Sequence, residues 1–302
     1  MYQSHIYIEA RIQLDAVDSV FGTDEKTGKI YINEEVLKKV FTLSQALSCR
    51  IPSISDIEHI KGNLPKTDEC KKIKGYSVKV AEGGTIKLLF HSRSKNIKID
   101  EVRVEEDSGR LTHTNGTTRM DFSCAGNPSI RIKTENSFEL GEEVFLFLDE
   151  LRRLVQYLHL DNNSCKDGAI RCNAYVSLSK YPNAPDYYVK LRNLNSFNFA
   201  RKAVNHELTR QENMIINGEQ VQGESRIWNE AKSCTEFFQI RQAFSKRFEH
   251  LTPPKTINLE KWQKEALDIL KIELPEARRQ RLKKQYEVSR LRAEFLCDSK
   301  DR

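Results

Sequence analysis

The chain has 302 residues, with 49 Lys and Arg against 43 Asp and Glu, which gives a formal net charge of +6. This length accommodates one large domain or two ordinary ones with a sizeable core. No stretch approaches the ~20 apolar residues of a membrane span, and the start lacks the features of a signal or transit peptide, so we expect no association with a membrane. The charge excess is too small to indicate nucleic-acid binding by itself, although it permits a basic face.

The seven cysteines are scattered along the chain and form no Cys-x-x-Cys pair. Secreted scaffolds pair an even number of cysteines, and structural zinc sites space theirs closely. The pattern therefore predicts reduced thiols in a reducing compartment, with neither a disulfide framework nor a zinc site.

The N-terminal segment combines one strand and one helix. Residues from Ile6 to Leu14 alternate apolar and polar side chains, which is the period of a half-buried strand. Asn33 followed by two glutamates is typical of a helix start, because acidic side chains favour the first turn. Residues 50–75 predict irregular structure. One face of the helix would carry Val36, Val40, Leu43 and Leu47.

The middle of the chain is rich in strands. Tyr76–Val80 and Thr85–Phe90 flank Gly83-Gly84, which predicts a hairpin. This order of strands and helices predicts an α+β fold on an antiparallel or mixed sheet. Further strands are expected at Ile97–Val104, Ser129–Lys133, Ile170–Leu178 and Tyr187–Leu194, and helices at Glu139–Leu158 and from Asn195 or Ser196 to about Ile216.

Residues 249–257 contain Pro253-Pro254 and predict a linker, so that a first domain spans residues 1–250 and a helical segment spans residues 251–302. Helices are expected at residues 258–271 and 276–296, the second opening at Pro275, a favoured first-turn residue. The basic side chains of the second helix could contact RNA phosphates, but a pattern of this kind is more commonly an ordinary exposed helix face. They are Arg278, Arg279, Arg281, Lys283 and Lys284.

Acidic side chains near strand ends are the first candidates for chemistry. Glu9 lies in the first strand, Glu105-Glu106-Asp107 end another, and Glu135 follows a third. Carboxylates that converge from one sheet can bind Mg²⁺, which prefers oxygen ligands, but taken alone such acids are more commonly surface groups or loop caps. His113 and His206 are candidates for acid–base work without a partner fixed by the sequence.

Five segments, in order along nearly the whole chain, resemble the B subunit of the tRNA-dependent amidotransferase, the GatB/GatE family. Arg192-Asn-Leu-Asn-Ser-Phe is similar to the family's Lys-Asn-Leu-Asn-Ser-Phe, and Val104-Glu-Glu-Asp-Ser-Gly-Arg to its Leu-Glu-Glu-Asp-Ala-Gly-Lys. The other three are Ile170-Arg-Cys-Asn-Ala-Tyr-Val-Ser, similar to Leu-Arg-Cys-Asp-Ala-Asn-Val-Ser; Glu224-Ser-Arg-Ile-Trp-Asn-Glu-Ala, similar to Glu-Thr-Arg-x-Trp-Asp-Glu-Ala; and Leu274-Pro-Glu-Ala-Arg-Arg, similar to Leu-Pro-x-x-Arg-Arg.

The resemblance implies a glutamine-synthetase-like cradle domain over residues 1–250, followed by the beginning of a helical domain that is shorter than in typical relatives. It also implies an ATP- and Mg²⁺-dependent carbon–nitrogen ligase with glutamine as amide donor. Such an enzyme phosphorylates the side-chain carboxylate of Glu-tRNA(Gln), and ammonia then displaces the phosphate, a good leaving group. The implied partners are the amidase (A) subunit, the small (C) subunit of the complex, and the misacylated tRNA, in the mitochondrial matrix or, for a bacterial source, the cytoplasm.

Two positions of the implied metal site depart from the family. The first strand reads Ile8-Glu-Ala-Arg-Ile-Gln-Leu where the family has Leu-Glu-Val-His-Val-Gln-Leu, so Glu9 matches but the metal-binding His is Arg11. Pro128-Ser-Ile-Arg-Ile replaces Pro-Leu-Ile-Glu-Ile, so a second metal ligand is Arg131.

Other implied site residues are kept or only faintly matched. Glu105 and Glu106 keep the carboxylate role, with Glu106 as the metal ligand. Lys66, in Gly62-Asn-Leu-Pro-Lys, is the implied nucleotide contact, and Lys190 reverses the charge of a family Glu.

An arginine cannot ligate a cation and repels one nearby. Either Arg11 and Arg131 neutralise phosphate or Glu106 and leave a metal-poor or inactive site, or neighbouring acids such as Glu135 replace the lost ligands; the chemistry favours the first. The leading hypothesis, an amidotransferase subunit that forms Gln-tRNA(Gln), therefore has as its alternative a catalytically degenerate paralogue that serves as a scaffold for the amidase. A stand-alone RNA-binding module is the weakest hypothesis, because the basic excess is small.

Overall fold

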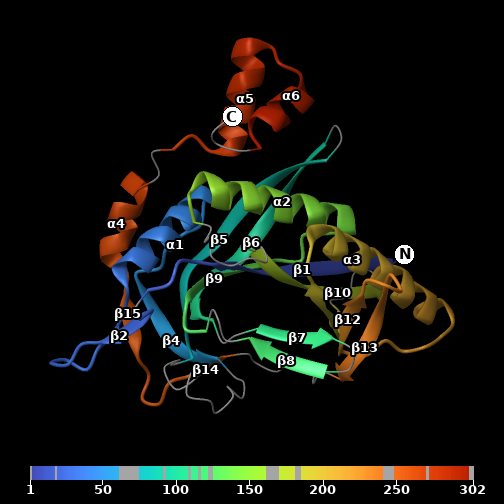
Figure 1. Cartoon of the computed structure of the whole chain (residues 1–302), viewed down its shortest axis with the longest axis horizontal. Coiled ribbons are helices and arrows are strands. Elements are labelled where there is room, and N and C mark those ends of the chain that lie inside the picture. Colours follow the sequence, from blue (N-terminus) through green and yellow to red (C-terminus); the bar gives the residue numbers. More distant parts are fainter. Residues whose placement is uncertain are drawn as a thin grey trace.

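The structure is a computed structural model, and its main feature is a long twisted sheet with helices packed on one face (Figure 1). It describes all residues except 1, 18, 61–74, 91–92, 108–109, 115–116, 122–124, 161–169, 181–184, 241–247, 270–271 and 299–302. For residues 90, 93, 110–114, 117–121, 180, 264 and 266–269 it describes the backbone alone.

The large sheet contains 11 strands in the order β13-β12-β11-β10-β1-β9-β6-β5-β4-β14, with β15 also paired to β4. Neighbours are antiparallel except for the parallel pair β11–β12, which confirms the predicted mixed sheet. The strands are β1 (Tyr2–Gln13), β4 (Ile54–Ile60), β5 (Tyr76–Phe90), β6 (Arg93–Glu106), β9 (Pro128–Thr134), β10 (Ile170–Lys180), β11 (Val189–Leu194), β12 (Glu224–Asn229), β13 (Cys234–Ile240), β14 (Phe248–His250) and β15 (Thr256–Asn258).

Two small hairpins and the helices complete the architecture. The hairpins pair β2 (Phe21–Thr23) with β3 (Ile30–Ile32) and β7 (Arg110–Thr114) with β8 (Thr117–Asp121). Helices α1 (Glu34–Ala46), α2 (Gly141–Tyr157) and α3 (Phe197–Ile216) lie along one face of the sheet, whereas β7–β8 lies on the opposite side (Figure 1). Helix α4 (Glu260–Ile269) packs against α1, and α5 (Pro275–Tyr286) and α6 (Arg290–Leu296) stand beyond α2.

The hydrophobic core lies between the sheet and its three covering helices. Ile8, Ala10 and Ile12 of β1 are fully buried, as are Val144 and Leu148 of α2. The helices therefore bury the apolar half of each alternating strand, and the polar half is left for the other face. Among the described residues, no helix is both long enough and apolar enough to cross a membrane.

Caps explain where two predicted helices begin. The Asn33 side chain accepts a hydrogen bond from the backbone of Glu35, and Ser196 accepts one from the backbone of Phe199, so α1 and α3 start where the sequence predicts. Asn193 adopts a left-handed φ of 61°, and its amide donates to the backbone oxygen of Trp228 at 3.2 Å. The Asn-Leu-Asn-Ser segment thus contains the end of β11 and the N-cap of α3.

The predicted hairpin at Gly83-Gly84 is wrong, because β5 runs through both glycines and pairs with β6 on either side of them. Gly83 has a left-handed φ of 56°, which lets the strand bend. At Gly84 a Cβ atom would lie 2.5 Å from the Cys49 sulfur and 2.6 Å from the Leu47 oxygen. Gly84 therefore lets the segment that follows α1 approach a continuous strand, and Gly83 supplies the left-handed backbone beside it.

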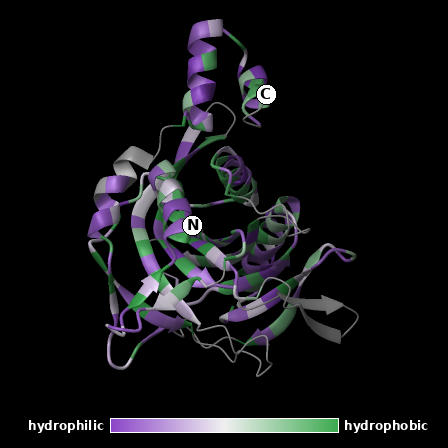
Figure 2. Cartoon of the chain, turned by 60° about the vertical axis from the view of Figure 1, so that its left-hand side comes forward, coloured by the Kyte–Doolittle hydropathy of each residue, from purple (hydrophilic) through white to green (hydrophobic). Residues whose placement is uncertain are grey.

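Three other boundaries differ from the sequence predictions. The expected linker at residues 249–257 contains parts of β14 and β15, which pair with β4. Strand β4 itself lies in the segment predicted as irregular. The predicted final helix is two helices, since Glu287 takes a left-handed φ of 50° and ends α5. Helix α5 is mainly hydrophilic and stands away from the sheet (Figure 2). The domain boundary at residue 250 stays a prediction.

Candidate functional site

Charged side chains of neighbouring strands form rows on the face of the sheet opposite the helices. Arg11 of β1 is paired in register with Arg131 of β9, which is paired with Arg103 of β6. Like charges directly opposite one another repel, so this row of arginines requires carboxylates beside it. Glu9 of β1 and Glu101 of β6 supply two of them, since both are paired with Lys133, two residues along β9 from Arg131.

Arg131 is the centre of this arrangement and is only 2 % exposed. Its three guanidinium nitrogens contact three carboxylates from three strand positions: Nη1 lies 3.1 Å from Glu9, Nη2 lies 2.5 Å from Glu101, and Nε lies 3.0 Å from Glu105. Charge-assisted hydrogen bonds of this kind are the strong ones. A single guanidinium therefore joins β1, β6 and β9.

The second oxygen of each of these carboxylates also has a donor. Tyr175 donates its hydroxyl proton to Glu9 at 2.7 Å, Arg103 Nη1 lies 3.2 Å from Glu101, and Arg11 Nη2 lies 2.6 Å from Glu105. All six oxygens of Glu9, Glu101 and Glu105 thus accept a hydrogen bond from a side chain. Arg103 also pairs with Glu58 of β4. We call Arg11, Arg103, Arg131, Glu9, Glu58, Glu101 and Glu105 the arginine–carboxylate cluster.

An aromatic ring covers the cluster. The Phe248 ring of β14 lies 4.0 Å from the Arg103 guanidinium carbon and 5.0 Å from that of Arg131, measured to the ring centroid. Such cation–π contacts are favourable and displace water from the cations. Burial alone would lower the pKa of Arg131, but the charges of Glu105, Glu9 and Glu101 outweigh it and raise that pKa above its ordinary value. Arg131 therefore stays charged at any pH at which the protein is folded.

This donor set does not fit Mg²⁺. A magnesium ion needs carboxylate oxygens that are free to approach it, whereas the oxygens of Glu9, Glu101 and Glu105 are taken by arginine and tyrosine donors. The guanidinium of Arg131 would also repel a nearby cation. Within the described part of the chain, no group of three or more His, Cys, Asp or Glu side chains could hold a metal ion.

The other predicted site residues fall in different places. Glu106 is buried and accepts a hydrogen bond from the backbone of Gly75 at 2.9 Å, and successive strand residues alternate between faces, so it does not share the setting of Glu105. Glu135 forms a surface ion pair with Lys98 at 3.8 Å. Lys66 lies outside the described residues, and its nucleotide role, like the metal role of Glu106, stays a prediction.

The two candidate histidines have other settings. His206 contacts Thr235 at 3.1 Å and the ring of Trp228, and burial lowers its pKa. The side chain of His113, in β7, lies outside the described part.

A stack of lysines and tyrosines beside the cluster was not predicted from the sequence. The rings of Tyr7 and Tyr175 are parallel, with centroids 4.3 Å apart. Lys133 lies over Tyr7 at 5.5 Å, and Lys190 lies over Tyr175 at 5.1 Å. Tyr175 connects this lysine–tyrosine stack to Glu9. Tyr7 and Lys133 lie two residues from Glu9 and Arg131 on β1 and β9, so their spacing could have indicated them, whereas Tyr175 and Lys190 come from β10 and β11, which carry none of the three arginines.

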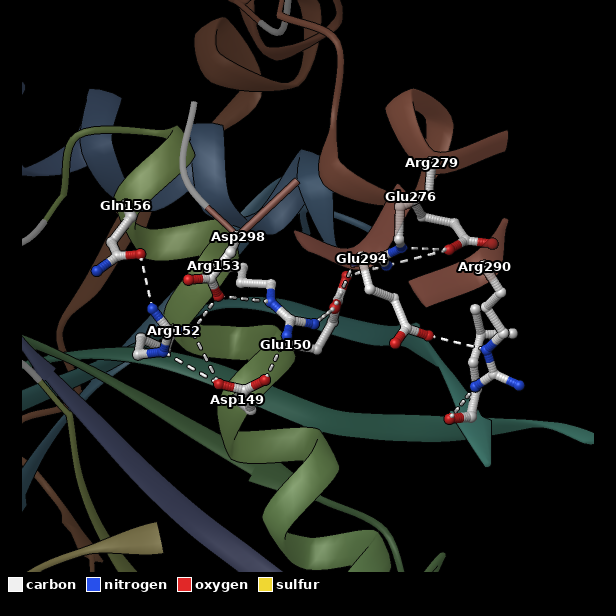
Figure 3. A network of polar contacts seen from close by, with 11 residues as sticks. Asp149, Glu150, Arg152, Arg153, Gln156, Glu276, Arg279, Arg290, Glu294 and Asp298 are labelled. Carbon is white, nitrogen blue, oxygen red and sulfur yellow. Dashed lines mark hydrogen bonds and ion pairs between the residues drawn. The ribbon is translucent and has the colours of Figure 1, made fainter. Parts of the chain in front are cut away.

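Three of the five basic residues of α5 contact other side chains of the chain, whereas Lys283 and Lys284 are exposed. Arg279, 4 % exposed, bridges Glu150 of α2 at 2.6 Å and Glu276 at 3.0 Å (Figure 3). Arg278 donates to the Tyr157 hydroxyl, and Arg281 pairs with Glu273. These contacts favour the structural interpretation of the basic helix over an RNA-binding face. We call the ion pairs between α2 and the C-terminal helices, including those of Arg152 and Arg153 with Asp298, the docking network.

A cavity of about 410 Å³ lies between α2, α3 and the β12–β13 hairpin. Trp228, which lies in one of the five segments singled out above, is one of the lining residues. None of the cluster residues lines this cavity, which is lined by Glu142, Arg201, Lys202, Asn205, Trp228 and Ser233.

Comparison with known proteins gives a consistent picture. A family model described as "GatB/GatE catalytic domain" matches residues 28–254, a range that includes Glu105 and Arg131 but leaves out Glu9 and Arg11. The chain is similar to the B subunit of the aspartyl/glutamyl-tRNA(Asn/Gln) amidotransferase of Geobacillus kaustophilus, with 28% identity over 277 residues, 89% of this chain and 57% of the relative. It is 29% identical to the Bacillus velezensis protein of the same name over 257 residues, 83% of this chain and 53% of the relative. The chain thus spans about half the length of the curated relatives it matches.

Proposed function

Because the chain belongs to the GatB/GatE catalytic domain family, we propose that it serves as the B-type subunit of a tRNA-dependent amidotransferase assembly and binds its partners there without transferring phosphate. The observation that carries this proposal is the contact set of Arg131. With each oxygen of Glu9, Glu101 and Glu105 held by a protein donor, the cluster offers no ligands to a magnesium ion that would neutralise a transferring phosphoryl group.

The partners in this proposal are an amidase (A) subunit, a small (C) subunit, and a misacylated tRNA. The helix-covered sheet with its buried apolar core supplies a folded body for such contacts. The setting would be bacterial translation or translation in mitochondria.

A second candidate function is catalytic. Glu105, Glu106 and Asp107 are retained, and each is buried at or just after the end of β6. They favour an ATP- and Mg²⁺-dependent ligase that forms Gln-tRNA(Gln) with ammonia from glutamine, provided that the side chains of the cluster rearrange when substrate binds. This alternative would require Arg131 to leave three carboxylates, a rearrangement that buried ion pairs oppose.

Reconstitution separates the two functions. The chain would be mixed with the amidase and small subunits, glutamine, ATP, Mg²⁺ and Glu-tRNA(Gln), and both complex formation and Gln-tRNA(Gln) would be measured. We expect a complex that forms no Gln-tRNA(Gln). A matched control uses the Geobacillus kaustophilus relative, in full and shortened to the aligned region, so that the effect of length is measured separately.

Two results would count against the proposal. Failure to bind the amidase and small subunits would remove the scaffold role. Formation of Gln-tRNA(Gln) that depends on ATP and Mg²⁺ and is lost in Glu106→Gln would establish the catalytic alternative.

A further inference from the structure

The arginine–carboxylate cluster has the form of a coordination site whose centre is a side chain. Arg131 places three nitrogens toward three carboxylates from two neighbouring strands, at 2.5–3.1 Å. A divalent cation bound by Glu9, Glu101 and Glu105 would neutralise the same three groups. The guanidinium therefore fills, in charge and in position, the place that a metal ion takes when carboxylates converge.

The surrounding donors make this replacement complete. Tyr175, Arg103 and Arg11 occupy the remaining oxygens of the three carboxylates. Three guanidinium groups face the four carboxylates of the cluster, so burial does not leave a large excess of negative charge that an external ion must balance. The Phe248 ring closes the arrangement on the open side of the sheet.

Four of the residues that depart from the resembled motifs form one connected unit. Arg11 and Arg131 meet at Glu105, Arg131 and Tyr175 meet at Glu9, and Lys190 lies over the Tyr175 ring at 5.1 Å. In the motifs quoted above, these four positions carry His, Glu, Asn and Glu. Their contact indicates that the site has been rebuilt around a positive side chain.

We propose that Arg131 is a resident cation that takes the place of a divalent metal ion, so that the cluster closes without metal and becomes a divalent-cation site only when the positive charge of Arg131 is removed. This inference stands on the contacts of the cluster and does not depend on the role of the chain in an amidotransferase assembly.

The test uses Mn²⁺ as a paramagnetic probe for the wild-type chain and for Arg131→Glu. In the wild type, Mn²⁺ should leave the melting temperature unchanged, and the electron paramagnetic resonance signal of free Mn²⁺ should not fall. In Arg131→Glu, four carboxylates converge, so Mn²⁺ at about 100 times its Kd should raise the melting temperature by about 5–10 °C. About one Mn²⁺ per chain should then be bound.

Two matched variants make the result specific. Arg131→Lys keeps the positive charge and should not bind Mn²⁺. Glu105→Gln in the Arg131→Glu background removes the carboxylate that faces both Arg131 and Arg11, and should abolish the gain.

Stoichiometric Mn²⁺ binding by the wild type that is lost in Glu105→Gln would overturn the proposal, and this measurement does not require any arginine variant to fold. A folded Arg131→Glu protein without a response to Mn²⁺ would overturn it as well. If Arg131→Glu folds only when Mn²⁺ is present, as followed by circular dichroism, that dependence is itself the predicted gain.

Discussion

The arginine–carboxylate cluster and the docking network both depend on a nearly buried arginine, yet they differ in how completely its partners are enclosed. Arg131 is held within one sheet, by carboxylates whose other oxygens are also bonded. Arg279 lies between separate helices, and its partner Glu276 remains partly exposed. The comparison indicates that Arg131 holds neighbouring strands of the sheet together. Arg279 instead attaches α5 and α6 to α2, and water can reach its carboxylate partners when these helices separate from α2.

The largest effect is expected when Arg131 loses its charge. Arg131→Gln leaves three enclosed carboxylates without their shared cation, and breaking a buried pair costs about 3–5 kcal/mol. Unfolding in urea, followed by circular dichroism, measures the loss. Lys133→Gln is the matched control, because Lys133 lies two residues along the same strand face with its side chain 32 % exposed, and it should cost less than about 1 kcal/mol. An equal loss of unfolding free energy in the two variants would contradict the claim that Arg131 contributes more to stability than an exposed cation on the same strand.

A smaller and more local effect is expected for Arg279. Arg279→Gln removes charged hydrogen bonds to Glu150 and Glu276. A hydrogen bond to a charged group contributes about 1.5–3 kcal/mol to stability. The carboxylates can regain water once α5 and α6 separate from α2. Hydrogen exchange should therefore speed up in α5 and α6 while the amides of β1 and β9 keep their protection. Loss of protection in the sheet as well would show that the two regions are not independent.

Tyr175→Phe tests the outer part of the cluster. The substitution removes the hydroxyl that bonds to Glu9 but keeps the ring that stacks on Tyr7, so it isolates one hydrogen bond, worth about 1–2 kcal/mol. Urea unfolding again provides the measurement. Tyr188→Phe, which removes an exposed hydrogen bond to Asn136, should change stability little. If Tyr175→Phe left the free energy of unfolding unchanged, Glu9 would not need its second hydrogen-bond donor.

The smallest effect is a pH dependence of the docking network. The hydrogen bond from Arg152 lowers the pKa of Asp298 below its ordinary value of 3.8, with the charges of Arg152 and Arg153 acting in the same direction. A carboxyl group with a lowered pKa in the folded state stabilises that state above pH 3.8 and loses this contribution as the pH falls through the lowered value. The Asp298 side chain is 40 % exposed, so the effect should stay below about 1 kcal/mol.

Asp298→Asn supplies the reference for this pH dependence. Exchange of the α6 amides should depend on pH less steeply in the variant than in the wild type as the pH falls below 3.8. Identical profiles would remove Asp298 from the docking network.

The alternation of β1 was enough to predict which of its residues share a face, and the caps Asn33 and Ser196 placed two helix starts. The partners of Arg131 could not be predicted in the same way. Glu101 enters the cluster only because of the register between β6 and β9, which shifts at a bulge between Ile99 and Glu101. A bulge changes which side chains face the core, and local sequence does not determine it.

Contacts between distant parts of the chain were the other limit. Phe248 covers Arg131 from a segment that is adjacent to a predicted linker, and its strand exists only because it pairs with β4. The Gly83-Gly84 pair has the composition of a turn, but both glycines lie within a strand, where Gly84 admits the segment that follows α1. In both cases tertiary packing decides between structures that the local sequence allows equally.

The most direct test of the central claim, that a guanidinium rather than a metal neutralises Glu9, Glu101 and Glu105, is an anomalous diffraction map from crystals of the wild-type chain soaked in Mn²⁺. The account predicts guanidinium density between the three carboxylates and no anomalous peak there. A manganese peak bound by Glu105, with Arg131 turned away from Glu9 and Glu101, would contradict it.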